Sequence, residues 1–570
     1  MTKKNDLLRW GLRALLTLAL LIPLLVVAAC GATPAPTEAP PPEEPVEESA
    51  AVPTEEPAPE PTEEPAAEPV EEPAEATAEN TLITAYFEDI NTLDPDVWYD
   101  IEGGGTFRAV YEGLVSYGPG SNEIVPMLAE SWEVSDDGLT YTFNLRDDVT
   151  FHDGTPFNAD AVLYNFDRRL GVDQGPAYML ADIEEAEAVD DYTLKLTLSQ
   201  PVGPFLHLLA NMWGPKMISP AAIQENEVDG DWAQEWAIDN MVGTGPYKLD
   251  ELVRGEKMVL AKNEDYWGGW EGDHVDQVHI RIIPETATQR LLLENGDLDI
   301  LMHGIAFSDL DAFIENPDLT VQELPSNFVH ILHQNAMRDQ LTDPKVRQAV
   351  SYAWDYDGVR QAVGATHIDP LITTYPQGFL GGDEPPLPYT FDLEKAKELM
   401  AESEYPDGGF TLEFIYLPNE REYWRAAAQI FQANLAQLGI ELDIQEMPIS
   451  MIWDLYDDPQ MTPHFFADSA TPDGSDPYLW TSIVWHSDGW LNWSHYVNEE
   501  VDALIDEGLY TVDEDERADI YREVGRIVGD DAPAIFVGDG LDHFAYQNNI
   551  GGIVQYPGYP WTIDFYHVNK

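Results

Sequence analysis

Apolar and polar residues alternate on both sides of Asp137-Gly138, which predicts two strands joined by a tight turn. A period of two is typical of half-buried strands, and Asp-Gly is a preferred hairpin turn. We therefore predict a β-hairpin in this part of the chain. Its alternating apolar residues are Trp132, Val134, Tyr141, Phe143 and Leu145.

A helical period appears between two strand-like runs, FTLEFIYL (410–417) and IELDIQEM (440–447). Asn419 can cap a helix, Glu422 is placed to complete a capping box, and Gly439 ends the apolar repeat. This strand–helix–strand order favours a parallel pair with a right-handed crossover. The apolar residues at helical spacing are Trp424, Ala427, Ala428, Phe431, Leu435 and Leu438.

Two other segments carry helix-start signals. Asn158 or Asp160 can begin a helix after the turn HDGTP, and Asp343-Pro344 can begin another, since proline is tolerated in a first turn. Together with the hairpin and the crossover unit, these segments predict an α/β body with hairpin-rich insertions.

The N-terminus has the order of a secretory signal: a basic start, an apolar run from Leu15 to Val27, and a small-residue triplet that ends at Cys30. The run is too short, and too closely followed by acidic sequence, for a membrane span. A small-residue triplet before cysteine resembles the bacterial lipobox. That resemblance implies that residues 1–30 are a lipoprotein signal peptide ending at the lipobox cysteine, that the signal is removed, and that Cys30 becomes the lipid-modified N-terminus. A plain signal peptide with an incidental cysteine is the alternative.

Residues 31–79 contain no lysine, arginine or aromatic residue and are dominated by proline, glutamate, alanine and threonine. Such a segment buries too little apolar surface to fold, and its prolines and like charges extend it. We interpret residues 31–80 as a disordered tether between the anchor and a globular body.

Composition limits the function. The formal net charge of −77 repels phosphate backbones, so nucleic acid is an unsuitable partner. The single cysteine excludes a disulfide within the chain and a zinc site built on paired cysteines. The length of 570 residues suits two or three domains.

The body resembles a known family. LAESWEVSDDGLTYTFNLRDDVTFHDGTPFNADAV is similar to the hallmark segment of the family 5 bacterial extracellular solute-binding proteins, the peptide- and nickel-binding components of ABC importers. Further motifs follow in the order of that family over residues 81–570. They are VGTGPYKL (242–249), NEDYWGG (263–269), RIIPETATQRLLLENGDLDI (281–300), DPKVRQAVSYAWDYDGV (343–359) and YVNEEVDALIDEG (496–508).

The resemblance implies an α/β, two-lobed periplasmic-binding-protein-like fold of type II with an extra subdomain. The first lobe would comprise residues 81–115, 241–324 and 531–570, and the extra subdomain residues 116–240. The second lobe would comprise residues 325–530. A solute would be enclosed between the lobes, which close like a hinged trap.

The same resemblance points to Asp468. It lies in HFFADSATPDGSDPYLW (464–480), which is similar to the segment whose aspartate pairs with the α-ammonium of the ligand in peptide-binding members. Phe465 or Phe466 replaces the usual tryptophan, and SATPDG has the look of an insertion. Asp473 and Asp476 therefore remain rival candidates.

Other candidate ligand-binding residues are Asp89, where the first strand would meet the cleft, and an aromatic group with one amide near residue 490. The aromatic side chains could line pockets or stack on sugar rings, with core or lobe packing as the alternative, whereas the alternative for Asp89 is an ordinary residue of a turn at a strand end. The group comprises Trp480, Trp485, Trp490 and Asn492.

We expect neither a metal site nor a cofactor. His330 and His333 are three apart on a strand-like run, so they would lie on opposite faces. No nucleophile elbow, phosphate-binding loop, zinc helix or dinucleotide fingerprint appears, so we expect no enzyme.

The expected function is that of a monomeric, extracytoplasmic lipoprotein, anchored on the outer face of the cytoplasmic membrane, that delivers an oligopeptide or dipeptide to ABC permease subunits. An oligosaccharide or a metal complex is the alternative ligand. A secreted hydrolase is the alternative from another class.

Overall fold

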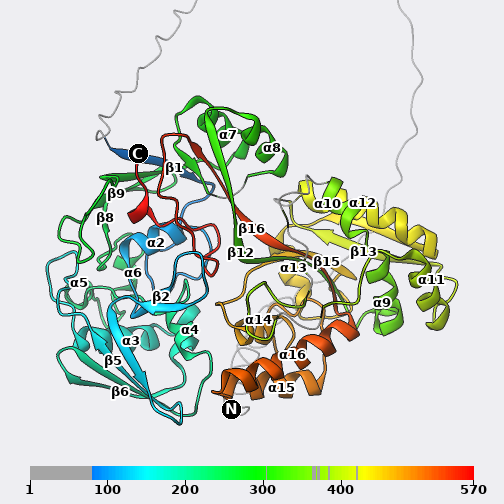
Figure 1. The fold of residues 1–570 in the computed structure, drawn as a ribbon, viewed down its shortest axis with the longest axis horizontal. Coiled ribbons are helices and arrows are strands. Elements are labelled where there is room, and N and C mark those ends of the chain that lie inside the picture. The colour runs from blue at the N-terminus through cyan, green and yellow to red at the C-terminus, as the bar shows by residue number, and fades with distance from the viewer. Residues whose placement is uncertain are drawn as a thin grey trace, which may run out of the picture. The chain divides into compact units, whose positions relative to one another are not determined.

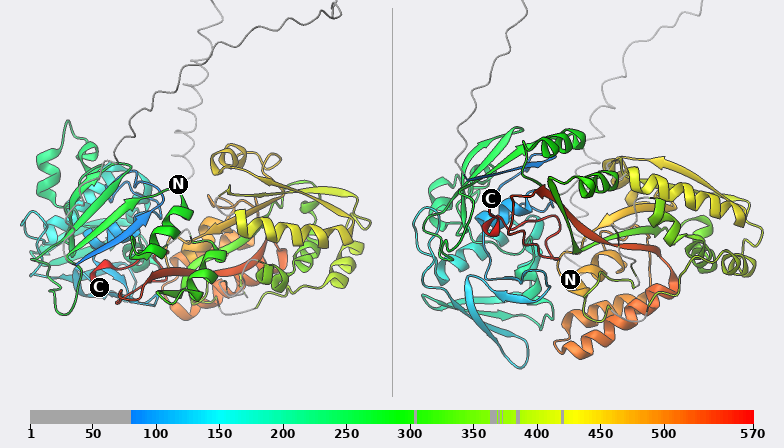
Figure 2. Two further views of the ribbon diagram at one scale, coloured as in Figure 1. Left: turned by 90° about the horizontal axis from the view of Figure 1, so that it is seen from above. Right: turned by 45° about the horizontal axis from the view of Figure 1, so that its top comes forward.

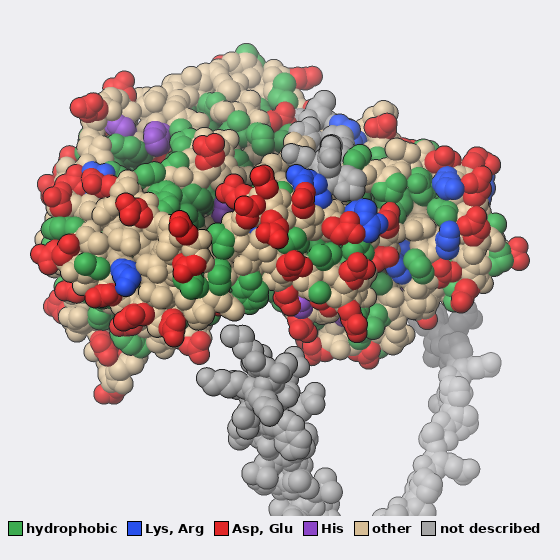
Figure 3. All heavy atoms as spheres, turned by 60° about the horizontal axis from the view of Figure 1, so that its bottom comes forward, with side chains coloured by type: hydrophobic (Ala, Val, Ile, Leu, Met, Phe, Trp, Pro, Cys, Tyr) green, Lys and Arg blue, Asp and Glu red, His purple; other side chains and the backbone are tan. Residues whose placement is uncertain are grey.

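The computed structural model describes residues 80–302, 305–362, 368, 371, 373–382, 386–418 and 421–570. Cys30, the predicted tether and Asn419 lie outside these residues. Within them, no helix is long and apolar enough to cross a membrane. Acidic side chains are spread over the face shown in Figure 3, among few lysines and arginines.

Ten strands form one mixed sheet whose two halves are joined by its longest strands. In spatial order they are β14 (Ile440–Glu446), β13 (Phe410–Tyr416), β15 (Phe465–Ala470), β12 (Leu319–Gln334), β16 (Ala534–Gln547), β11 (Ile300–Leu301), β1 (Thr81–Tyr86), β10 (Gln277–Ile282), β9 (Lys257–Lys262) and β8 (Tyr247–Val253).

β12 and β16 run side by side between the two halves in every ribbon view (Figures 1 and 2). Residues 319–325 of β12 pair with residues 541–547 of β16 in the first-lobe half, and residues 329–333 pair with residues 534–539 in the other. The predicted lobe boundary at residue 325 therefore falls inside β12, and β16 contributes to both halves of the sheet.

The predicted extra subdomain carries its own antiparallel strands. β4 (Ala129–Val134) and β5 (Thr140–Leu145) form the predicted hairpin around Asp137-Gly138 and continue through β7 (Thr193–Leu198) to β6 (Ile183–Asp190). β2 (Val115–Tyr117) and β3 (Ile124–Pro126) form a separate pair.

Helices cover the sheets at the predicted positions. Asn158 caps α3 through its side chain, and Asp343 caps α9 with proline in the first turn. β13, α12 and β14 form the predicted crossover with a parallel strand pair. The helices of the first lobe and subdomain are α2 (Gly104–Val110), α3 (Ala159–Val172), α4 (Phe205–Ala210), α5 (Pro220–Asn226), α6 (Gln234–Ala237), α7 (Thr286–Asn295) and α8 (Phe307–Glu315).

The second lobe buries both faces of its strands. Leu332 and Ala467 pack into one apolar cluster, whereas Ile331 and Ala470 on the opposite face pack into another with α14 and α16. Its helices are α9 (Pro344–Ala353), α10 (Tyr356–Ala362), α11 (Leu393–Glu402), α12 (Arg421–Leu435), α13 (Ile449–Tyr456), α14 (Pro477–Val484), α15 (Glu499–Tyr510) and α16 (Glu514–Asp531).

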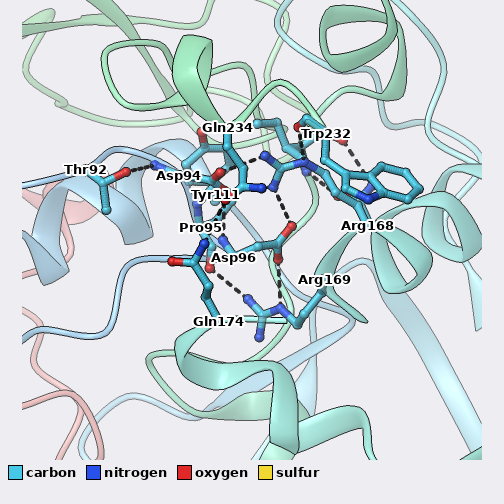
Figure 4. A network of polar contacts seen from close by, with 12 residues as sticks. Thr92, Asp94, Pro95, Asp96, Tyr111, Arg168, Arg169, Gln174, Trp232 and Gln234 are labelled. Carbon is cyan, nitrogen blue, oxygen red and sulfur yellow. Dashed lines mark hydrogen bonds and ion pairs between the residues drawn. The ribbon is translucent and has the colours of Figure 1, made fainter. Parts of the chain in front are cut away.

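A buried ion-pair network fixes the subdomain to the turn that follows β1 (Figure 4). Both terminal nitrogens of Arg168 donate to the Asp94 carboxylate at 2.7 Å, and one of them also reaches Asp96 at 2.6 Å. Arg169 donates to the other oxygen of Asp96 at 2.7 Å. Each side chain is 2 % exposed or less, so every buried carboxylate here has an arginine beside it.

Candidate functional site

A loop of the second lobe, residues 471–476 between β15 and α14, lies against the extra subdomain. The backbone N–H of Ser475 donates to the hydroxyl oxygen of Tyr117 at 2.9 Å. The hydroxyl of Tyr178 donates to Oδ2 of Asp473 at 2.6 Å. Two tyrosines of the subdomain therefore hold this loop across the boundary between the lobes.

Asp473 is a buried carboxylate without a cation. It is 5 % exposed, and burial raises its pKa to about 6, although hydrogen bonds from Tyr178 and Tyr99 favour the charged form. Among the described residues, no lysine, arginine or histidine forms an ion pair with it. A positively charged group placed here would therefore meet a carboxylate that the protein leaves uncompensated.

The two rival aspartates are engaged elsewhere. Asp476 caps α14 and accepts from Nη2 of Arg517 with both oxygens at 2.8 Å. Asp468, on β15, accepts from the backbone N–H of Ser469 at 2.9 Å and lies 3.6 Å from Nε2 of His333. Among the described residues, neither ring nitrogen of that buried histidine has a hydrogen-bond partner.

A cavity of 560 Å³ lies beside the loop and is lined by residues of the subdomain, the first lobe and the second lobe. Its volume is within the range of about 300–1,000 Å³ that is usual for small-molecule sites. Polar and charged residues make up most of the wall. They include Asn122, His207, Ser326, Asn327, Ser475, Asp476, Glu514, Arg517 and Asp539.

One wall of this cavity is an irregular stretch of the β12–β16 ladder. The register shifts between Pro325 and Val329, and the cavity contacts residues 325–327 and 539–541. A Cβ atom on Gly540 would lie 2.6 Å from Cδ1 of Phe328, so the close approach requires glycine. The cavity therefore contacts the strands that join the two halves of the sheet.

The predicted aromatic group is divided between core and surface. Trp480 and Trp485 are fully buried, and the indole N–H of Trp480 donates to the Thr374 carbonyl at 2.9 Å. Trp490 is 45 % exposed and stacks on Trp453 of α13 at 6.3 Å. These tryptophans are absent from the wall of the 560 Å³ cavity.

The two remaining candidates hold turns. The Asn492 amide donates to the carbonyls of His486 and Tyr496 at 3.2 and 2.8 Å. Asp89 accepts from the backbone N–H of Gly255 at 2.7 Å and pairs with Arg254 at 3.3 Å. Both side chains are therefore already bonded within the protein.

Sequence reasoning did not identify Tyr99, Tyr117 and Tyr178. A tyrosine far along the chain carries no local pattern that assigns it to an aspartate 295 residues away, as Tyr178 is from Asp473. No local sequence pattern pairs Arg517 with Asp476 either, because helix α16 brings the two together through tertiary packing. Within the described residues, no group of three or more His, Cys, Asp or Glu side chains is placed to hold a metal ion.

Comparisons with known proteins agree with the fold. Residues 123–492 match the model of bacterial extracellular solute-binding proteins, family 5. A probable D,D-dipeptide-binding periplasmic protein of Escherichia coli is 32 % identical over 85 % of this chain and 93 % of its own length. A heme-binding protein of Haemophilus influenzae is 30 % identical over 79 % of this chain and 85 % of its own length.

Among solved structures, an ABC transporter-associated periplasmic binding protein of Helicobacter pylori, in complex with the peptide STSA, is similar in fold. It is 26 % identical, with a TM-score of 0.71 over 86 % of this chain and 98 % of that one.

Proposed function

Because the chain belongs to family 5 of the bacterial extracellular solute-binding proteins, we propose that it binds a short peptide between its lobes and delivers it to an ABC importer. The buried carboxylate of Asp473 is the observation that carries this proposal. It lies on a loop that crosses the lobe boundary, and its partners are tyrosine hydroxyls rather than a cation.

The α-ammonium of a peptide matches this carboxylate in charge and hydrogen bonding. Burying an ionised carboxylate without a cation is costly, and the raised pKa of Asp473 reflects that cost. An ammonium beside Asp473 supplies the missing charge, while Tyr178 and Tyr99 keep the carboxylate oriented. Asp476 is a weaker candidate because Arg517 already neutralises it.

The cavity beside the loop, whose wall includes Ser475 and Asp476 but not Asp473, would supply room for the rest of a peptide. Side-chain amides and hydroxyls of Asn122, Asn327 and Ser326 line it, and such groups bond to peptide carbonyls and N–H groups without demanding one side chain. Its polar wall also favours retained water, which adapts a pocket to different residues.

A thermal-denaturation series with dialanine, trialanine and their N-acetylated forms tests the proposal. A bound ligand at 100 times its Kd adds about 2.7 kcal/mol to the free energy of unfolding. We expect free peptides to stabilise the protein and acetylated ones, which lack the ammonium, to do so far less. Equal effects of both forms would exclude recognition of the ammonium.

Variants decide which carboxylate is used. Asp473→Asn should lose the preference for free over acetylated peptides, while Asp468→Asn, the alternative from the sequence, should keep it. Asp148→Asn is the matched control, because its side chain is 51 % exposed and pairs with Arg146 away from the loop that carries Asp473. A preference lost in Asp468→Asn alone would assign the site to Asp468.

The heme-binding relative justifies including haem in the ligand series.

We propose no catalytic activity. Peptide recovered from the complex should have an unchanged mass, and a cleaved product would favour the hydrolase alternative.

We further propose that Cys30 anchors the protein by lipid to the outer face of the cytoplasmic membrane and that the body is monomeric. Cys30→Ser should move the protein from the membrane fraction to the soluble extracytoplasmic fraction. Light scattering of the soluble protein measures its mass in solution.

A further inference from the structure

A second cavity, of 240 Å³, lies within the first lobe and its subdomain and shares no lining residue with the cavity between the lobes. Its walls come from α2, the β2–β3 pair, the segment around Trp267 and the C-terminal stretch 556–567. Asp473 and its partners Tyr99 and Tyr178 are not among the residues that line this cavity.

Most charged groups on its wall have their partners within the protein. Arg108 pairs with Asp564 at 3.1 Å and lies over the Tyr556 ring at 3.8 Å. The carboxylate of Glu112 accepts three hydrogen bonds, from Thr244 at 2.8 Å and from the side chains of Tyr266 and Trp267 at 2.9 Å.

Lys216 differs from these groups. It is 9 % exposed, and its ammonium donates to the Asn211 carbonyl at 3.1 Å. No carboxylate of the described residues lies within ion-pair distance of it, although an ammonium has three donors to satisfy. The other buried cations near the lobe boundary, Arg168 and Arg517, each have a carboxylate partner.

We propose that this cavity binds a small monocarboxylic acid with an apolar or aromatic body, whose carboxylate pairs with the Lys216 ammonium. A cavity of about 150 Å³ is known to take benzene, so 240 Å³ has room for a ring and a carboxylate. Phe107, Tyr111 and Trp267 offer an apolar surface to the body of such an acid.

The charges around Lys216 predict how this binding varies with pH. Burial, together with the positive charges of Arg108 and Arg169, lowers its pKa to about 7, while Glu112 acts in the opposite direction. A bound carboxylate favours the charged lysine, so binding takes up a proton near neutral pH. Affinity for the acid should therefore fall as the pH rises above 7.

Benzoate is the probe, measured by calorimetry with the full folded body at pH 6.5, and benzyl alcohol is its uncharged counterpart. We expect one benzoate per chain and no binding of benzyl alcohol in the same concentration range. Lys216→Met should weaken benzoate binding at least tenfold. Lys248→Met is the matched control, because that lysine also donates to a backbone carbonyl, of His152, but lies outside the cavity.

Equal binding of benzoate by wild type and Lys216→Met would overturn the proposal, as would equal binding of benzyl alcohol or no binding by wild type. Should Lys216→Met fail to fold, the pH profile of Glu112→Gln decides, because burial also raises the pKa of Glu112, on the same wall, to about 7. Affinity in that variant must still drop roughly tenfold per pH unit above 7, and a flat profile rejects the site. Asp473→Asn changes no residue of this cavity. Benzoate binding by that variant therefore tests the Lys216 site independently of the peptide proposal.

Discussion

Asp94 and Asp96 are buried beside two arginines, whereas Asp473 is buried beside tyrosines. In the first region, every negative charge is neutralised by a side chain of the same chain, so the network fixes two structural units. In the second region, hydroxyls orient the carboxylate but leave its charge unbalanced. The carboxylates are buried in both regions. The difference is the missing cation, which a ligand can provide.

The largest expected effect comes from removing one arginine of the Asp94–Asp96 network, so that these buried carboxylates also lack a full balance of positive charge. Arg168→Met leaves Asp94 and Asp96 with one arginine between them. Breaking a buried ion pair by removing one partner costs about 3–5 kcal/mol. Urea denaturation should show a loss of stability in that range, and an unchanged midpoint would mean that the network does not depend on its charge balance.

Asp473→Asn instead removes the negative charge that no cation balances in the second region. Hydrogen bonds to charged groups contribute about 1.5–3 kcal/mol, so peptide affinity measured by calorimetry should fall tenfold or more. The unliganded variant should be at least as stable as the wild type, since no buried charge remains. A clear loss of stability without ligand would show that the carboxylate serves the fold.

Acid should weaken peptide binding through the same residue. The pKa of Asp473 is about 6, so its carboxylate is protonated as the pH falls through 6 and no longer attracts an ammonium. Affinity should be roughly tenfold lower at pH 5 than at pH 7. Asp542, with a pKa of about 7, also titrates in this range, so Asp473→Asn, in which the dependence should vanish, is the control.

The smallest effect is expected at the surface. Arg146 pairs with Asp148, whose side chain is 51 % exposed. Solvent-exposed ion pairs contribute about 0–1 kcal/mol, so Asp148→Asn, which leaves Arg146 over the Trp267 ring, should change the urea midpoint little. A loss of stability as large as that expected for Arg168→Met would show that burial does not explain the large effect expected of Arg168→Met.

Local elements could be predicted from the sequence because their signals are local. Asp137-Gly138 specified a hairpin, Asn158 and Asp343 specified helix starts, and the apolar period after residue 420 specified the crossover helix. Each of these depends on residues within one or two turns of each other, where backbone geometry alone fixes the contact.

The proposed site was harder to predict because it depends on contacts between distant segments. The motif around residue 468 indicated a strand and the loop after it, but it could not rank Asp468, Asp473 and Asp476. Their difference arises from His333, Tyr178 and Arg517, which the fold brings to them from separate elements. Pattern reasoning also could not separate buried Trp480 from exposed Trp490.

The interrupted pairing of β12 and β16 has a mechanical consequence. A regular ladder resists bending, but the stretch between Pro325 and Val329 lacks continuous pairing and so concentrates any rotation of one half of the sheet against the other. The 560 Å³ cavity contacts this same stretch through residues 325–327 and 539–541. On the proposed function, a ligand held in that cavity would therefore link its presence to the angle between the two halves of the sheet.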